Sequence, residues 1–258
     1  MSNNIDVYII NLSTSLDRKS KMQENIATWQ RCNPHNKDKI NFKFFKAKTP
    51  QDVKTSGFIN RYNRFMAWIW KARDVRLTEM ACFYSHFTLW EKCVEINKAF
   101  FILEDDVDFT PIFFDGLQDI IKQSYEYVRI SFRTFHKMIL VKENFAFGHA
   151  LILGASGYYI TPNAAKKLIK HSNKIYIAVD YYISSSYIHN VVEMVYSYPL
   201  VKINELDANS TIGKPEHQVK SKADKKRYKK FVIFREIHRI YRQIRTILFA
   251  ITRFYYIK

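Results

Sequence analysis

Residues 99–104 have the sequence AFFILE, in which every side chain before Glu104 is apolar. A strand with one face in water alternates polar and apolar side chains, whereas a strand covered on both faces has an unbroken apolar run. Other elements must therefore cover both faces of the sheet that contains this segment. We predict that residues 99–104 form a central parallel strand of a layered α/β fold.

Segments of strand and helix character alternate over most of the chain. The expected strands are residues 5–12, 40–45, 99–104, 126–132, 136–141, 156–161 and 191–200. Helical periodicity and capping residues predict helices that begin near Thr14, Thr78, Pro111, Pro162 and Asp180. This alternation predicts one α/β domain with a mostly parallel sheet, which we assign to residues 1–213.

The composition is that of a globular protein with a substantial core, since 47% of the 258 residues are hydrophobic and 16% are aromatic. Three cysteines without a C-x-x-C pair indicate reduced thiols rather than a disulfide framework or a zinc site. Residues 1–30 carry charges throughout and contain no apolar segment typical of a secretory signal. Residues 144–165 have no formal charge, but their glycines and proline favour strands and turns over a membrane span. We therefore expect a cytoplasmic protein.

The positive charge is concentrated at the C-terminal end. The formal net charge is +17, and residues 214–258 contain 14 lysines and arginines against three acidic residues. Within this tail, apolar side chains recur at steps of three and four residues: Ile233, Ile237, Ile240, Ile244, Ile247 or Leu248, Ile251 and Phe254. This spacing predicts a basic amphipathic helix, which is typical of a protein that binds an anionic membrane surface.

The basic tail has two other interpretations. The apolar stripe would equally suit a helix that packs on the body of the protein. Nucleic acid is another partner for basic segments, but the chain contains no zinc-finger spacing, no glycine-aromatic RNA-binding signature and no convincing helix-turn-helix. We therefore expect no nucleic-acid partner and favour the membrane surface.

Four carboxylates directly follow the apolar strand: Glu104, Asp105, Asp106 and Asp108. Ligands of α/β sheets bind beyond the carboxyl ends of the strands, where these residues lie. In an extended segment Glu104, Asp106 and Asp108 would share one face, with Asp105 on the other. Convergent carboxylates suit Mg²⁺ or Mn²⁺, which often also binds substrate phosphates. A solvated acidic turn is the alternative interpretation.

Five segments resemble glycosyltransferase family 25, which includes bacterial lipooligosaccharide β-galactosyltransferases and related collagen galactosyltransferases. In chain order they are VYIINLSTSLDRKSKM, LTEMACFYSHFTLWEK, FILEDDV, GASGYYITPNAAKKLI and IAVDYYI. Together they cover roughly residues 5–212 in the family's order. Two departures are Thr161, where the family has serine, and Ala178, where proline usually precedes the acidic VD motif.

The resemblance implies a GT-A-like nucleotide-binding domain, a UDP-sugar donor that is most often UDP-galactose, Mn²⁺ dependence and inversion at the anomeric carbon. It implies the following donor-binding residues: Asn11, Leu12, Arg18, Ser85, His86 and Asp105. Asp106 is implied as the metal ligand, with Glu104 assisting, and we add Asp108 to this set from its predicted face. A structural role in the core is the alternative for His86.

An inverting transfer needs a base that takes a proton from the acceptor hydroxyl. Asp180, in the family's second acidic motif, is our first candidate for this catalytic residue. It would alternatively cap a helix, or it would bind the metal and leave the base role to another acid such as Glu193.

Two hypotheses for function follow. The first is an inverting, metal-dependent hexosyltransferase that adds β-linked galactose to a lipooligosaccharide or lipopolysaccharide acceptor at the inner membrane of a bacterium. The second is a non-catalytic peripheral membrane protein that binds anionic lipid through its tail. Oligomeric state, acceptor sugar and linkage are not predicted.

Overall fold

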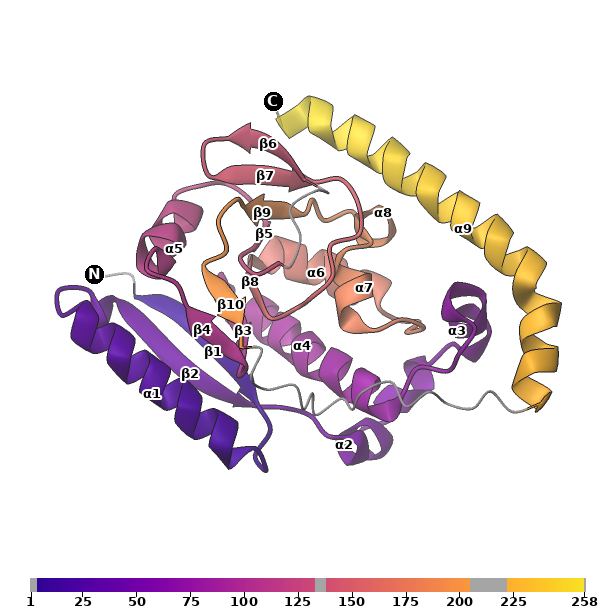
Figure 1. The fold of residues 1–258 in the computed structure, drawn as a ribbon, viewed down its shortest axis with the longest axis horizontal. Coiled ribbons are helices and arrows are strands. Elements are labelled where there is room, and N and C mark those ends of the chain that lie inside the picture. The colour runs from indigo at the N-terminus through magenta and orange to yellow at the C-terminus, as the bar shows by residue number, and fades with distance from the viewer. Residues whose placement is uncertain (1–3, 133–137, 205–221, 258) are drawn as a thin grey trace.

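The computed structural model describes residues 4–132, 138–204 and 222–257 (Figure 1). Within these residues an eight-stranded sheet has the strand order β2-β1-β3-β8-β5-β9-β7-β6. Its strands are β1 Ile5–Asn11, β2 Ile40–Lys46, β3 Phe100–Glu104, β5 Tyr127–Arg129, β6 Met138–Lys142, β7 Phe145–Gly148, β8 Gly157–Ile160 and β9 Met194–Tyr196. The chain therefore folds into a mixed α/β structure with a large central sheet, and the α/β class predicted from its sequence is confirmed.

The prediction of a mostly parallel sheet is wrong. Strands β2, β1 and β3 are parallel, as are β5 and β9, but β8 runs antiparallel to both of its neighbours, and β7 is antiparallel to both β9 and β6. Only two residues separate β6 from β7, and a connection this short can join only antiparallel strands. The apolar run of β3 indicates that both faces of the sheet are covered. It does not indicate whether the neighbouring strand is parallel or antiparallel.

Helices cover both faces of β3, as its sequence predicted. Phe100 and Ile102 point into a core formed with α4 and α6, whereas Phe101 and Leu103 point into a second core formed with α1 and α5. All four side chains are at most 1% exposed. The four helices are α1 Leu16–Cys32, α4 Leu77–Glu95, α5 Phe113–Ile121 and α6 Pro162–His171.

Short elements complete the body. Two strands, β4 Val107–Phe109 and β10 Val201–Ile203, pair antiparallel beside the main sheet. The short helices are α2 Pro50–Thr55, α3 Arg64–Lys71, α7 Val179–Ile183 and α8 Ser186–His189, with 3₁₀ turns η1 at Lys37–Lys39 and η2 at Phe58–Arg61. The sequence patterns missed α2, α3, β4, β7 and β10, because each is too short to establish a period.

The last helix, α9 Lys222–Ile257, runs along one side of the body past α3 and α8 (Figure 1). The boundary predicted between residues 213 and 214 lies outside the described residues. Among the described helices, none has a stretch that is both long and apolar enough to cross a membrane. The three cysteines are free thiols.

Buried His189, at the end of α8, generates a pH prediction. Its Nδ1 accepts the N–H of Val191 at 3.2 Å, and its Nε2–H therefore donates to the carbonyls of Tyr182 and Ile183 at 3.1 and 3.0 Å. Burial lowers the pKa of His189 to about 4. Between pH ~6.5 and the folded pKa, the unfolded state takes up a proton that the folded state does not.

We therefore expect the free energy of unfolding to fall as the pH is lowered through this window, by up to about 1.4 kcal/mol per pH unit from this group. Urea titrations at several pH values measure it. The variant His189→Gln should lose part of this pH dependence, whereas His171→Gln, at an exposed histidine of α6, should retain it. Equal pH dependence in both variants would show that His189 is not responsible.

Candidate functional site

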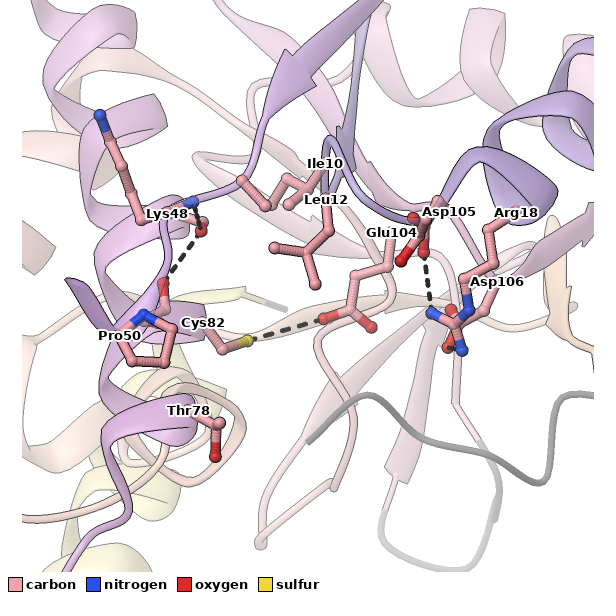
Figure 2. A pocket seen from close by; sticks show the side chains of 14 residues that line it. Ile10, Leu12, Arg18, Lys48, Pro50, Thr78, Cys82, Glu104, Asp105 and Asp106 are labelled. Carbon is pink, nitrogen blue, oxygen red and sulfur yellow. Dashed lines mark hydrogen bonds and ion pairs between the residues drawn. The ribbon is translucent and has the colours of Figure 1, made fainter. Parts of the chain in front are cut away.

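A cavity of about 140 Å³ opens at the carboxyl ends of β1 and β3 (Figure 2). The acidic turn after β3 forms one wall, and α4 forms another with Thr78, Cys82 and Ser85. Arg18 of α1 and Lys48, which follows β2, supply positive charge. The cavity thus combines carboxylates, cations and a partly apolar lining at the sheet edge where α/β proteins bind ligands.

The four carboxylates do not share one extended segment. Strand β3 ends at Glu104, Asp105 and Asp106 form a turn, and β4 begins at Val107. The turn brings Glu104, Asp105 and Asp106 to the cavity. Asp108 lies on β4, is exposed, and accepts a hydrogen bond from Asn204 Nδ2 at 2.9 Å. The alternation expected for an extended chain is interrupted at the turn, and the structure does not place Asp108 in the cavity wall.

Asp105 ties the acidic turn to the N-terminal part of the chain. Its Oδ2 accepts a hydrogen bond from Asn11 Nδ2 at 2.6 Å, and its Oδ1 accepts one from Arg18 Nη1 at 2.9 Å. The side chains of Arg18 and Asp105 are only 10% and 8% exposed. Because Asn11 ends β1 and Arg18 belongs to the first turn of α1, this network holds three elements around one rim of the cavity.

The pKa of the Asp106 carboxyl group is strongly raised. Its Oδ1 is buried and has no hydrogen-bond partner among the described residues. Burial and the charges of Glu104 and Asp105 raise the pKa of Asp106 to about 7, against the opposing effect of Arg18, whose Nη2 lies 3.8 Å from Asp106 Oδ2. A divalent cation would relieve both causes, since it replaces lost hydration and neutralises the neighbouring charge. Glu104 and Asp106 therefore fit Mg²⁺ or Mn²⁺, which prefer oxygen ligands.

Polar groups behind the cavity lower the pKa of Glu104. Trp90 Nε1–H donates to Tyr158 Oη at 2.9 Å, and Tyr158 Oη lies 2.8 Å from His86 Nδ1. Nε2 of His86 lies 3.6 Å from Glu104 Oε1, while Ser156 Oγ donates to Glu104 Oε2 at 2.9 Å. Burial alone would raise the pKa of Glu104, but His86, Ser156 and the charge of Arg18 lower it. The environment thus separates two neighbouring carboxylic acids, with Glu104 more acidic than Asp106.

A second set of possible metal ligands shares Glu104. The ligand atoms of Cys82, His86 and Glu104 lie within 4.8 Å of one another. A thiol and an imidazole suit Zn²⁺ rather than Mn²⁺. However, burial and the nearby charges of Glu104 and Asp180 raise the pKa of the Cys82 thiol well above its usual value, which disfavours the thiolate that zinc requires. The oxygen-only pair, Glu104 with Asp106, is the better cation site.

The structure brings most of the predicted donor-binding residues together. Leu12, Arg18, Ser85 and Asp105 line the cavity. Asn11 and His86 are buried directly behind this lining, where they orient Asp105 and Glu104.

Ser85 also has a structural task. Its Oγ accepts the backbone N–H of Lys48 at 2.8 Å and donates to the Ala81 carbonyl at 2.9 Å. The cavity-lining residues Lys48, Thr78 and Cys82 were not predicted. Lys48 was detectable in principle, because it follows the carboxyl end of a predicted strand.

Asp180 does not line the cavity but lies near its acidic wall. It is the second residue of α7, behind the N-cap Ala178, and its Oδ1 accepts the N–H of Tyr181 at 2.8 Å. Burial and the charge of Glu104 raise the pKa of Asp180, and its own charge raises that of Cys82. Asp180 is therefore a half-buried acid whose pKa responds to the charge of Glu104.

Glu193, the alternative base, is committed elsewhere. Its Oε1 lies 2.6 Å from Arg129 Nε, and the two side chains are 2% and 0% exposed. Arg129 also donates to the Gly154 carbonyl and, at 3.1 Å, to Ser184 Oγ. A carboxylate in such a buried ion pair is not positioned to take a proton from a ligand in the cavity.

Comparisons with known proteins show the family of the chain. Residues 4–183 match the profile described as "Glycosyltransferase family 25 (LPS biosynthesis protein)". The chain is 28% identical over 182 residues to the lipooligosaccharide biosynthesis protein lic2B of Haemophilus influenzae, covering 64% of this chain and 62% of that protein.

Two further relatives are similar. Lipooligosaccharide biosynthesis protein lex-1 of Haemophilus influenzae is 28% identical over 197 residues, with 64% of each protein covered. A glycosyltransferase 25 family member of Anopheles gambiae is 26% identical over 173 residues, which cover 64% of this chain and 28% of that protein. In each case the similarity spans less than two thirds of the relative's length.

The network around Asp105 generates a stability prediction. The variant Asp105→Asn replaces one of the two accepting oxygens with an amide group, so Asn11 or Arg18 loses its hydrogen-bond partner, and leaving a buried donor unsatisfied costs about 1–3 kcal/mol of unfolding free energy. Asp108→Asn, at an exposed carboxylate three positions on, should change it by less than about 0.5 kcal/mol. Urea unfolding of both variants measures the difference. Equal midpoints would show that the network does not support the fold.

Proposed function

The chain belongs to glycosyltransferase family 25, and we propose that it is an inverting, metal-dependent UDP-sugar hexosyltransferase with a GT-A-like nucleotide-binding domain. The observation that carries this proposal is the pair Glu104 and Asp106 at the carboxyl end of β3. Their proximity, burial and opposite pKa shifts produce a site that a divalent cation and a diphosphate complete. A solvated turn would show none of these three properties.

In this proposal Asp106 and Glu104 would hold Mn²⁺ or Mg²⁺, which would supply positive charge for the departing nucleoside diphosphate. Arg18 and Lys48 add positive charge to the same cavity. Leu12, Ile10 and Pro50 form the apolar part of the lining, which suits the face of a uracil ring. Asn11 orients Asp105 and His86 lies behind Glu104, and neither lines the cavity.

We assign the acceptor side to Asp180. Its raised pKa moves it toward the range in which a carboxylate accepts a proton effectively at neutral pH, and Glu193 is excluded by its ion pair with Arg129. The family and the two relatives named as lipooligosaccharide biosynthesis proteins support a glycolipid acceptor. We propose β-linked transfer of galactose from UDP-galactose, at the inner-membrane surface of a bacterium.

Ligand-dependent thermal stability tests the donor site. With UDP-galactose and Mn²⁺ at about 100 times the dissociation constant, the protein should gain roughly 2.7 kcal/mol, or roughly 5–10 °C in Tm. EDTA should remove the shift. UDP-glucose and UDP-N-acetylglucosamine, measured in parallel, identify the preferred sugar.

Variants sharpen this test. Asp106→Asn should abolish the Mn²⁺-dependent shift, whereas Asp108→Asn should retain it because Asp108 lies on β4, outside the cavity lining. Cys82→Ser should keep the preference for Mn²⁺ over Zn²⁺. If no nucleotide sugar shifts Tm, the protein is not a transferase. That result would support the alternative function, a non-catalytic lipid-binding protein.

Steady-state kinetics tests Asp180. Removal of a general base lowers the rate of chemistry by about 10²–10⁴-fold, so Asp180→Asn should reduce kcat to this extent. Because Asp180 does not line the donor cavity, the Tm shift with UDP-galactose and Mn²⁺ should persist. Loss of that shift would instead identify Asp180 as a metal ligand.

A further inference from the structure

Helix α9 exposes a continuous apolar surface, which we call the isoleucine face. It consists of Ile233, Ile237, Ile240, Ile244, Ile247 and Ile251. Each of these side chains is between 51% and 70% exposed. Their alternating spacing of four and three residues places all six on one side of the helix. Beside them lie four more exposed apolar side chains at seven-residue intervals: Phe234, Tyr241, Leu248 and Tyr255.

The opposite side of α9 contacts the body, through polar and aromatic groups. The guanidinium of Arg242 lies 3.9 Å from the ring centroid of Trp70, and the ring of His238 lies 5.6 Å from the same indole. Further along, Arg253 Nη2 donates to Asn190 Oδ1 at 2.5 Å, and the Phe254 ring lies 6.1 Å from that of Phe147. An ordinary surface helix buries its apolar stripe, whereas the six isoleucines of α9 are exposed. The apolar residues of α9 that do pack on the body are Phe231, Ala250 and Phe254, and the sequence had assigned Phe254 to the stripe.

We propose that the isoleucine face binds an anionic lipid bilayer, with α9 lying in the plane of the headgroup–acyl boundary. This deepens the proposed function and rests on it for the nature of the acceptor, a glycolipid at the same surface. The sequence suggested that the stripe packs either on the body or on a membrane. The contacts of Arg242 and His238 remove the first possibility, because they place the stripe on the far side of the helix.

Charge decides between a membrane and a second copy of the chain. Residues 222–258 contain 12 lysines and arginines against two acidic residues. Two copies of α9 brought together would place these cations close to one another, whereas an anionic membrane attracts them. Arg245 is exposed and lies 5.9 Å from the ring of Tyr241, beside the flanking apolar side chains, where lipid phosphates would meet the helix.

The width of the face leads to the same conclusion. At 100° per residue, the six isoleucines and their four apolar neighbours occupy an arc of about 140°, wider than the narrow seam of a two-stranded coiled coil. Tyr241 and Tyr255 combine an apolar ring with a polar hydroxyl, which suits the boundary between acyl chains and headgroups.

Binding of the full chain to lipid vesicles tests the proposal. The protein should bind phosphatidylglycerol–phosphatidylcholine vesicles more tightly than phosphatidylcholine vesicles. The double variant Ile240→Ser/Ile244→Ser should weaken this binding at least about tenfold. The matched control is Ile96→Ser/Ile121→Ser, which changes two exposed isoleucines of the body, at the ends of α4 and α5, and should bind like the unmodified chain.

Three outcomes would overturn the proposal: no vesicle binding by the unmodified chain, equal binding by the Ile240→Ser/Ile244→Ser variant, or a lipid-free oligomer that only this variant dissociates. The last outcome would assign the isoleucine face to a second copy. Thermal shifts with UDP-galactose and Mn²⁺ on the same variants separate this proposal from the transferase. If the Ile240→Ser/Ile244→Ser variant keeps the thermal shifts but loses vesicle binding, the result supports both the transferase and the membrane proposal. If the unmodified chain binds vesicles but no nucleotide sugar shifts its Tm, the membrane proposal stands and the transferase proposal fails.

Discussion

The site depends on one buried carboxylate, Asp105. It receives hydrogen bonds from Asn11 at the end of β1 and from Arg18 in α1, and so it joins two elements far apart in sequence to the turn after β3. Two backbone hydrogen bonds also hold the turn, from Glu104 N–H to the Ser156 carbonyl at 3.0 Å and from Asn204 N–H to the Asp106 carbonyl at 2.8 Å. Asp105 lines the cavity beside Glu104 and Asp106, but its two oxygens are occupied by Asn11 and Arg18.

The same network sets the electrostatics of the cavity. Arg18 neutralises part of the charge of the acidic turn. The hydrogen-bonded side chains of Trp90, Tyr158 and His86 lie behind Glu104, and His86 stabilises the charge on Glu104. Burial and a second negative charge so close to the first raise the pKa of Asp106. The divalent cation that we propose for this site would relieve the repulsion.

Helix α9 is the part of the protein that we propose contacts the membrane. Burying arginine and histidine against Trp70 while leaving isoleucines in water gives up hydrophobic stabilisation in the free protein. Under our membrane proposal, contact between the isoleucine face and lipid would recover this stabilisation. A catalytic body held in this way would meet its acceptor by diffusion in two dimensions, because the acceptor we propose is anchored in the same membrane.

The amino-acid sequence by itself determined the α/β class, the buried character of β3, the helical period of α9 and the acidic residues of the site, because each depends on the order of neighbouring side chains. Only the tertiary structure decided the direction of the strands and the turn that separates Asp108 from Glu104 and Asp106. It also decided the ion pair that excludes Glu193 as the catalytic base and the side that α9 presents to the body. These features depend on partners such as Arg18, Arg129 and Trp70, which lie many residues away and leave no local pattern in the sequence.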